Sequence, residues 1–217
     1  MKKIYSKIFA VAFLLTTGCL CSCIKVIKQS PADSKYTDKN YHVNDFQTLE
    51  VHGNVELYLI KGNAAKVVIK GKTFDIKNYK VEQNGNTLSI GQQSKGSNII
   101  NFGSSSNAKI YVCAPNLKNI NVSGNSEIQV QEPIKAKSFN ANISGNSEVN
   151  LHLYKVTNSV IDLSGNSDMT IQYDSCYHSV VDVSGNSDIA LNGTLKKKLE
   201  IDSGGNSDFS NNVTYLK

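Results

Sequence analysis

The sequence predicts an all-β protein, a single-stranded right-handed parallel β-helix that completes one turn about every 20 residues. Three observations support this fold. A polar pentapeptide recurs at a fixed pitch, apolar and polar residues alternate on both sides of it, and the interval leaves no room for a helix of normal length. A repeat this regular indicates one structural unit copied along an axis.

The pentapeptide reads Ser-Gly-Asn-Ser followed by an acidic residue. Its copies are Ser123–Glu127, Ser144–Glu148, Ser164–Asp168, Ser184–Asp188 and, slightly altered, Gly204–Asp208. Glycine supplies the positive φ that a tight corner needs, and serine and asparagine can hydrogen-bond the corner backbone. The residues expected to form structural corners are therefore Gly124, Asn125, Gly145, Asn146, Gly165, Asn166, Gly185, Asn186, Gly205 and Asn206.

The residues around each corner alternate with a period of two. In the first copy Ile120 and Val122 precede the glycine, and Ile128 and Val130 follow it. Each copy thus predicts two short strands with one buried face each. A repeat of two-stranded hairpins would show the same alternation, but similar corners at a constant pitch favour a coil whose strands pair one turn later, at about 4.8 Å.

Stacked turns would align equivalent side chains. In a coil, the corner asparagines would form a ladder of side-chain amides, each bonded to the next, and the column from Ser126 to Ser207 could add hydroxyl bonds. We therefore interpret the pentapeptide mainly as a structural element.

The section before the regular repeats also resembles β-structure. Short strand-like runs such as Val55–Leu59 and Ile110–Val112 alternate with turn residues, and the Ser-, Gly- and Asn-rich stretch Ser94–Ser106 predicts an exposed loop. We expect residues 45–217 to form one head domain, in which 116–217 carry the regular repeats and the preceding part supplies the first turns and a cap.

The N-terminus resembles a bacterial lipoprotein signal. A basic start is followed by the short apolar run Ile8–Leu15, which is too short to span a membrane. Leu20-Cys21-Ser22-Cys23 resembles a lipobox, with Thr17-Gly18-Cys19 as a weaker candidate. We expect residues 1–22 to be the signal peptide, Cys23 to carry the lipid, and residues 23–44 to form the tether. Ordinary cleavage nearby, giving a soluble secreted protein, is the alternative.

Composition narrows the classes of partner. The net charge of +5 includes three lysines of the signal, and the remaining 20 lysines against 18 acids leave 20 − 18 = +2. The chain has no arginine, whose planar fork suits phosphates, and no tryptophan. The sequence therefore predicts no nucleic-acid partner.

Two cysteines remain after cleavage. A coil would place Cys113 and Cys176 three turns, or roughly 14 Å, apart, which is beyond the roughly 7 Å that a disulfide bridges between α-carbons. We expect two separate, reduced and buried thiols.

Acidic residues supply the strongest candidate for chemistry. The pentapeptides align one column: Glu127, Glu148, Asp168, Asp188 and Asp208. A second column, of Asp162, Asp182 and Asp202, precedes the corners. Stacked carboxylates repel by roughly 1 kcal/mol per neighbour even in water, so corner N–H groups or a bound cation should offset this repulsion. Such oxygen-rich sites suit Ca²⁺; otherwise no cofactor is expected.

The lipobox, the segment Phe46–Leu57 and the later Ser-Gly repeats together resemble the putative auto-transporter adhesin, head GIN domain family. The resemblance covers residues 45–217, although here Asn-Ser replaces the second Ser-Gly of the usual family repeat. It implies a right-handed β-helix on an envelope lipoprotein with an adhesive role, and it supplies no catalytic residues.

The favoured function is therefore a non-enzymatic cell-envelope lipoprotein, attached to the outer membrane, that binds a glycan or a protein through repetitive polar faces. One alternative is a polysaccharide-processing enzyme, for which Asp174 or His178 near Lys155 would supply the non-repeating groups. A structural periplasmic scaffold without an external ligand is the third hypothesis.

Overall fold

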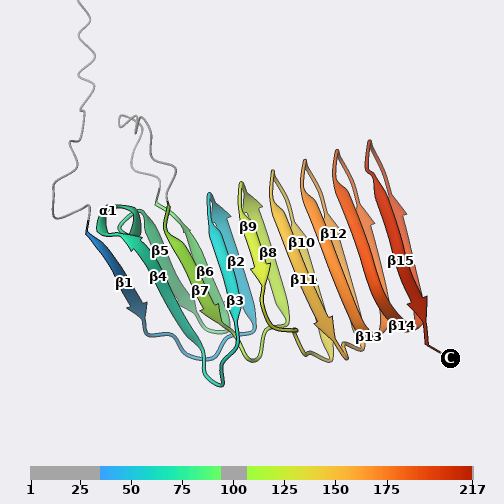
Figure 1. The fold of residues 1–217 in the computed structure, drawn as a ribbon, viewed down its shortest axis with the longest axis horizontal. Helices are drawn as coiled ribbons and strands as arrows, with labels where there is room; N and C mark the ends of the chain where they lie inside the picture. The colour runs from blue at the N-terminus through green and yellow to red at the C-terminus, as the bar shows by residue number, and fades with distance from the viewer. Residues whose placement is uncertain (1–34, 94–106, 217) are drawn as a thin grey trace, which may run out of the picture.

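The structure is a computed structural model that describes residues 35–93 and 107–216, and these residues form an elongated solenoid of stacked strands (Figure 1). The all-β prediction is confirmed, with about 5 turns at a spacing of about 20 residues. The signal segment, Cys23 and the loop expected at Ser94–Ser106 lie outside the described residues. No helix within the described ranges is long and apolar enough to cross a bilayer.

Strands account for most of the described chain, and the one helix within it is α1 (Thr73–Ile76). The strands are β1 (Tyr36–Tyr41), β2 (Thr48–Gly53), β3 (Glu56–Ile60), β4 (Lys66–Lys72), β5 (Tyr79–Asn84), β6 (Thr87–Gln92), β7 (Lys109–Cys113), β8 (Asn119–Gly124), β9 (Glu127–Val130), β10 (Ser138–Ile143), β11 (Glu148–Tyr154), β12 (Asn158–Leu163), β13 (Asp168–Val183), β14 (Asp188–Ser203) and β15 (Phe209–Tyr215).

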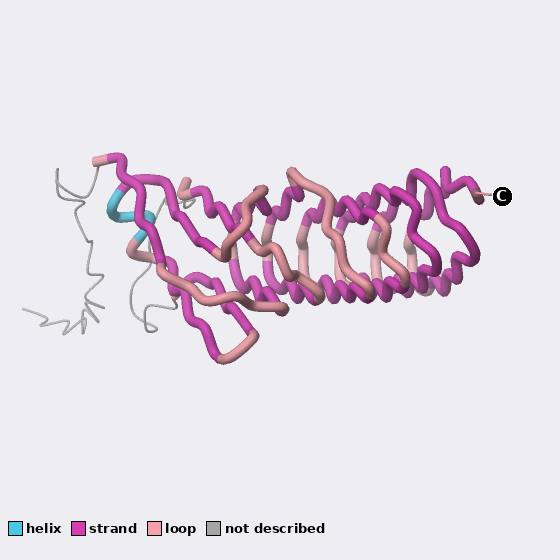
Figure 2. Tube along the Cα trace, turned by 90° about the horizontal axis from the view of Figure 1, so that it is seen from below, coloured by secondary structure: helices cyan, strands magenta, loops and turns pink. Residues whose placement is uncertain are grey.

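Each regular turn contains one strand before the glycine corner and one strand after it. β10 pairs in parallel with β8 and β12, while β11 pairs in parallel with β9 and β13. β13 and β14 are 16 residues long and continue around the edge opposite the corners, so each ends one turn and begins the next. Figure 2 shows this part as a regular stack along the long axis. This parallel pairing between turns identifies the coil and excludes the hairpin repeat.

The order of the turns in space differs from their order in sequence. β2 pairs in parallel with both β6 and β8, and β3 pairs in parallel with both β7 and β9. The turn made by β2 and β3 therefore lies between the β6–β7 level and the first regular repeat. After β1, the chain forms the β2–β3 level inside the stack, next forms β4 to β7 on its N-terminal side, and then continues with β8 on its other side.

Antiparallel strands close the N-terminal end. β5 pairs with β6, β4 with β7, and β1 with β4. β1 corrects the expected tether, because residues 36–41 are paired strand and belong to the fold. The outermost strands β1 and β5 are short and carry exposed lysines such as Lys39 and Lys80, features that discourage further strand pairing.

The glycine corners stack directly above one another. Gly145 has φ of 93°, and a β-carbon built on it would lie 2.2 Å from the carbonyl oxygen of Gly124. Glycine is thus required both for its backbone conformation and for the close approach of successive turns. The backbone N–H of Asn146 donates to that same Gly124 carbonyl at 2.7 Å, and the pattern repeats at every later corner.

The expected amide ladder at the corners is wrong. The corner asparagines are exposed, and among the described residues no hydrogen bond joins the side chain of one to the next, because their backbone N–H groups make the inter-turn bonds. Amide ladders occur instead before the corner, where Asn140 donates to Asn119 at 2.9 Å and Asn142 donates to Asn121 at 3.1 Å.

The serines that follow the corner asparagines form a buried column. The hydroxyl of Ser167 accepts a hydrogen bond from the backbone N–H of Ser147 at 3.2 Å and donates to the carbonyl of Gly145 at 3.2 Å. Ser187 makes the equivalent bonds one turn later. These hydroxyls satisfy corner backbone groups that water does not reach.

Columns of apolar side chains point into the coil from both strands of each turn. Ala141 and Ile143 before the corner, and Val149 and Leu151 after it, are at most 3% exposed. At the edge opposite the corners the core includes polar groups that satisfy one another. Tyr173 Oη lies 2.8 Å from Ser179 Oγ, which accepts a hydrogen bond from a further serine one turn away.

The two cysteines of the head domain are both buried and unpaired. Cys113 is 4% exposed and Cys176 is fully buried, and burial raises the pKa of each thiol. Their expected separation of three turns needs correction. Four strand steps lead from β7 through β3, β9 and β11 to β13, or about 19 Å at the usual strand spacing, because the β2–β3 turn lies between them.

Candidate functional site

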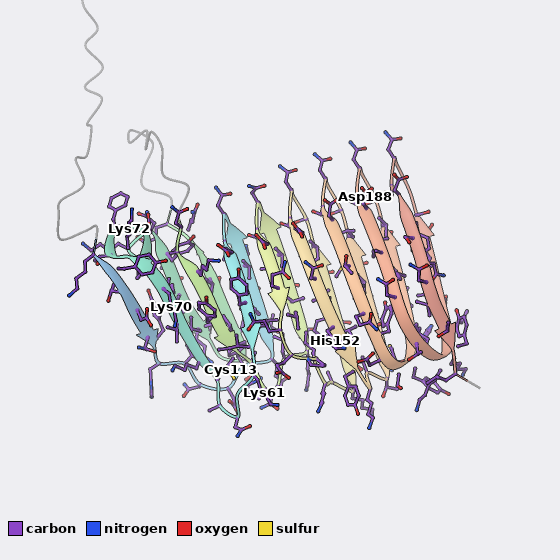
Figure 3. All side chains as sticks on the ribbon, in the orientation of Figure 1. Lys61, Lys70, Lys72, Cys113, His152 and Asp188 are labelled. Atoms are coloured by element: carbon purple, nitrogen blue, oxygen red, sulfur yellow. The ribbon has the colours of Figure 1, made fainter. Side chains whose placement is uncertain are left out.

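The strand register aligns the predicted acidic column. Glu127 pairs with Glu148, Glu148 with Asp168, and Asp168 with Asp188, while the backbone N–H of Asp208 donates to Asp188 Oδ1 at 3.3 Å. These five side chains, together with Asp162, Asp182 and Asp202 on the strand before each corner, flank the column of glycines. We call this region the acidic edge. Figure 3 shows Asp188 near the tips of the turns.

Lysines compensate the acidic column only at its N-terminal end. The column continues below Glu127 to Glu56 and then to Lys109, whose ammonium group lies 2.8 Å from the Glu56 carboxylate. One step further, Lys70 lies 3.4 Å from Asp38. Burial acts to raise the pKa of Glu56, but hydrogen bonds from Lys109 and Tyr58 outweigh burial and leave this pKa lowered.

The later part of the column has no such compensation. Within residues 35–93 and 107–216, no lysine or histidine forms an ion pair with Glu127, Glu148, Asp168, Asp188 or Asp208. The described residues also contain no group of three or more His, Cys, Asp or Glu side chains that could hold a metal ion. Ca²⁺ needs six or more oxygens around one point, whereas a column spreads its carboxylates along a line. The described residues thus do not form the calcium site that the sequence left open as one of two alternatives.

The opposite edge of the solenoid carries a groove that does not repeat. It encloses about 450 Å³ and is lined by Leu59, Ile60, Lys61, Gly62, Ala114, Pro115, Leu117, Glu132, Pro133, Ile134, Lys135, Tyr154 and Asp174. These residues come mainly from the irregular loops that join one turn to the next. Lys61 and His152 lie on this side of the molecule in Figure 3, away from Asp188.

Asp174 is held in place on the wall of this groove. His152 Nε2 lies 2.7 Å from Asp174 Oδ2, and Gln172 donates to the other carboxylate oxygen at 3.3 Å. The hydrogen bond from His152 is the main cause that lowers the pKa of Asp174, with a smaller contribution from Gln172 and partial opposition from burial.

Two lysines flank Tyr154 at the rim of the groove. Lys135 Nζ lies 5.0 Å and Lys155 Nζ 4.9 Å from the centre of the ring, within the range of a cation–π contact. Hydrogen bonding to Lys155 and its charge lower the pKa of Tyr154. Lys155 itself has φ of 52°, an uncommon conformation for a residue with a side chain.

A second hollow of about 270 Å³ lies next along this edge. Its lining includes Lys155, Thr157, Tyr177 and Lys196. Lys197 Nζ lies 5.6 Å from the ring centre of Tyr177, which is 44% exposed. The same pairing of lysine and tyrosine thus occurs at both hollows.

The residues considered for the enzymatic alternative are only partly brought together. Lys155 donates its backbone N–H to the carbonyl of Asp174 at 2.8 Å. His178, however, is on the strand before the corner and lies 2.9 Å from Glu200, while Asp174 is occupied by His152. The structure thus joins Lys155 to Asp174 through the backbone and pairs His178 with Glu200.

The sequence reasoning missed the lysine-rich edge, although the signal was present. Between residues 119 and 216 the lysines are Lys135, Lys137, Lys155, Lys196, Lys197 and Lys198. All lie where one turn passes to the next, and none lies in a pentapeptide or on the residues flanking it. The prediction used only the regular spacing of the acids in the pentapeptides. It did not consider that the lysines lie between the pentapeptides.

Comparison with known proteins gives the fold and the family. A putative adhesin from Parabacteroides distasonis ATCC 8503 has a similar structure, with a TM-score of 0.73 and 20% identity over 85% of this chain and 76% of that chain. A putative adhesin from Bacteroides fragilis NCTC 9343 gives a TM-score of 0.49 and 16% identity over 88% of this chain and 100% of that chain. No curated protein matches the sequence. Residues 45–215 match the family model described as putative auto-transporter adhesin, head GIN domain, and the chain belongs to this family.

Proposed function

We propose that this protein is a non-enzymatic cell-envelope lipoprotein that binds a glycan or a protein through the repeated polar side chains of its acidic edge. The observation that carries this proposal is the in-register stacking of equivalent residues over successive turns. A column of this kind presents the same group at a constant interval of about 4.8 Å, so many weak contacts can act together.

The surroundings of the column support a binding role. Two positions after each acid, on the same face of the strand, the side chain is often polar, as in Gln129, Asn150 and Thr170. This face also has a shallow hollow between Glu148 and Ser210. The uncompensated acids create a negative potential along one side, which favours partners with matching polar or cationic groups. Family membership and the similar adhesin fold agree with this role.

The anchor completes the proposal. Acylation of Cys23 would hold the head domain at a membrane surface, and we place the protein at the outer membrane. An adhesin must be attached to its own cell to hold that cell to another surface. Several acyl chains on one residue would give such stable membrane binding.

The test combines a binding screen with a variant of the acidic edge. The full chain in detergent is applied to a glycan array and to immobilised extracellular-matrix proteins, beside the variant Asp168→Asn/Asp188→Asn/Asp208→Asn. A ligand whose binding is lost in the variant supports the proposal. Absence of any ligand, or turnover of a polysaccharide by the wild type, would contradict it.

A further inference from the structure

The solenoid separates its charges across its width. Of the eleven acids in the repeats from residue 119 onward, eight flank the glycine corners, whereas every lysine lies toward the opposite edge. The other three acids lie among these lysines, since Glu132 and Asp174 line the groove and Glu200 pairs with Lys198. The remaining lysines of this edge are all exposed, and we call it the basic edge: Lys135, Lys137, Lys155, Lys196 and Lys197. Because the head domain and tether together carry only a small net charge, attraction for an anion depends on local groups of lysines, of which this edge is one.

The strand register places lysine or tyrosine side chains of this edge on consecutive turns, although the turn that carries Tyr177 has no lysine. Asn158 pairs with His178 and His178 with Lys198, so Thr157, Tyr177 and Lys197 lie on successive turns, with a register shift beside Tyr177. Ser138 pairs with Asn158, which places Lys137 one step earlier. An extended polymer lying along the solenoid would thus meet lysine and tyrosine side chains over several successive turns.

The basic edge has two concavities as well as its lysines: the groove described above, which is the larger hollow, and the smaller hollow next to it. Lys135 and Tyr154 line the larger one, and Lys155, Tyr177 and Lys196 line the smaller one. Small-ligand sites typically combine such a concavity with apolar walls and a few polar groups. The larger hollow has apolar walls from Leu59, Ile134 and their neighbours, and its charged lining includes Glu132 and Asp174 beside Lys61 and Lys135.

We propose that the basic edge binds an anionic polysaccharide, with Lys135, Lys155 and Lys196 contacting its carboxylate or sulfate groups and sugar rings entering the two hollows. This surface is separate from the acidic edge, so this binding site is distinct from the one in the proposed function and can be tested independently of it. Lysine acts as a compact point charge without the fixed fork of arginine. Binding should therefore be sensitive to salt and tolerant of the exact sugar.

Two other anionic partners fit the surface less well. Nucleic-acid sites commonly use the planar fork of arginine to contact phosphates, and the chain has no arginine. A membrane-binding surface needs protruding apolar side chains along its length, whereas the large exposed apolar residues at this edge are Tyr177 and, at its C-terminal end, Tyr215 and Leu216. The hollowed outline also suits a polymer better than a flat bilayer.

The experiment measures binding of the full chain in detergent to polygalacturonate, with uncharged dextran as the neutral probe. Lys135→Gln/Lys155→Gln/Lys196→Gln removes three charges of the basic edge. The control Lys39→Gln/Lys72→Gln/Lys80→Gln removes three exposed lysines from the N-terminal cap strands. Thermal unfolding confirms that both variants fold.

We expect binding to polygalacturonate that weakens with salt, and a loss of about tenfold in the basic-edge variant against a change within about twofold in the control. Equal losses in both variants, no binding, or equal binding of dextran would overturn the inference. So would tighter binding to duplex DNA or to phosphatidylglycerol vesicles. Loss of polygalacturonate binding in the acidic-edge variant but not in the basic-edge variant would overturn this inference while leaving the proposed function intact.

Discussion

The ammonium group of Lys109 lies 2.8 Å from the carboxylate of Glu56, at the level where the acidic column begins. Beyond Glu56 the column continues through Glu127 to Asp208 without another cation among the described residues. The N-terminal end of the column is thus balanced, and the regular repeats are not. We therefore expect the acids of the regular repeats, which have no cation partner, to contribute less to stability than Glu56 does.

Replacement of Asp168 by asparagine should stabilise the head domain. Asp168 has an acid directly above it and another below it, and repulsion between such neighbours amounts to roughly 1 kcal/mol each in water before screening by salt. We expect a higher melting temperature at low ionic strength and a smaller gain at high ionic strength. Glu56→Gln is the matched control and should destabilise, since it removes the partner of Lys109. A lower melting temperature for Asp168→Asn would show that the column is stabilising.

Replacement of Gly165 by alanine should destabilise the stack. Gly165 has φ of 89°, and the new β-carbon would lie 2.5 Å from the carbonyl oxygen of Gly145. We expect a loss of about 1–3 kcal/mol in the free energy of unfolding, measured by denaturant titration. Gly204→Ala is the control, because Gly204 has no positive φ and nothing within 4 Å of its added β-carbon. Equal stability of the two variants would argue against the close stacking of corners.

The pair formed by His152 and Asp174 should give an acid-dependent contribution to stability. The pKa of Asp174 is lowered in the folded state by the hydrogen bond from His152, so the contribution is present above the ordinary aspartate pKa of about 3.9. It is lost as the pH falls through the lowered folded-state pKa. We expect wild type to melt above Asp174→Asn near neutral pH, with the two curves converging in acid. A difference that does not change with pH would mean that this carboxylate does not contribute through its charge.

The thiols should be inaccessible in the native protein. Cys113 and Cys176 are buried, and their raised pKa values reduce the thiolate fraction that reacts. A thiol reagent applied to the Cys19→Ser/Cys21→Ser/Cys23→Ser variant should therefore modify both residues only after denaturation. Fast labelling of the folded chain would contradict the packing described here.

The proposed lipid anchor at Cys23 predicts that its replacement changes the location of the protein. Cys23→Ser should prevent acylation, so the protein should leave the membrane fraction and fail to incorporate a labelled fatty acid. Cys19→Ser is the control and should stay membrane-bound. If Cys19→Ser rather than Cys23→Ser abolished labelling, the acylated residue would be Cys19.

The sequence was sufficient to predict the regular part of the fold. Gly124, Gly145 and their successors recur at nearly constant intervals, and the alternation around them identifies the buried faces, so the coil and the alignment of the acids followed from spacing alone. The amide ladder was predicted at the corner but lies a few residues before it. The spacing shows which residues are equivalent, but it does not show which side chains are close enough to form hydrogen bonds.

The remaining features depend on pairing between distant segments. The residues Thr48–Ile60 do not show that this turn lies between the cap and residue 119. The sequence of a strand indicates its buried face, but it does not specify which strands pair with its two edges. The basic edge was missed for a related reason. Lys135, Lys155 and Lys196 sit in loops of unequal length, and only the folded coil brings them to one side.

The position of the β2–β3 turn inside the stack has a consequence for how the chain can fold. Its two strands acquire neighbours on both sides only after β6, β7, β8 and β9 have all been made. Long-range pairings of this kind close large loops and slow the first step of folding. Growth should then proceed in one direction, each later repeat docking on a finished template, so loss of a whole distal repeat should be far better tolerated than loss of residues 48–60.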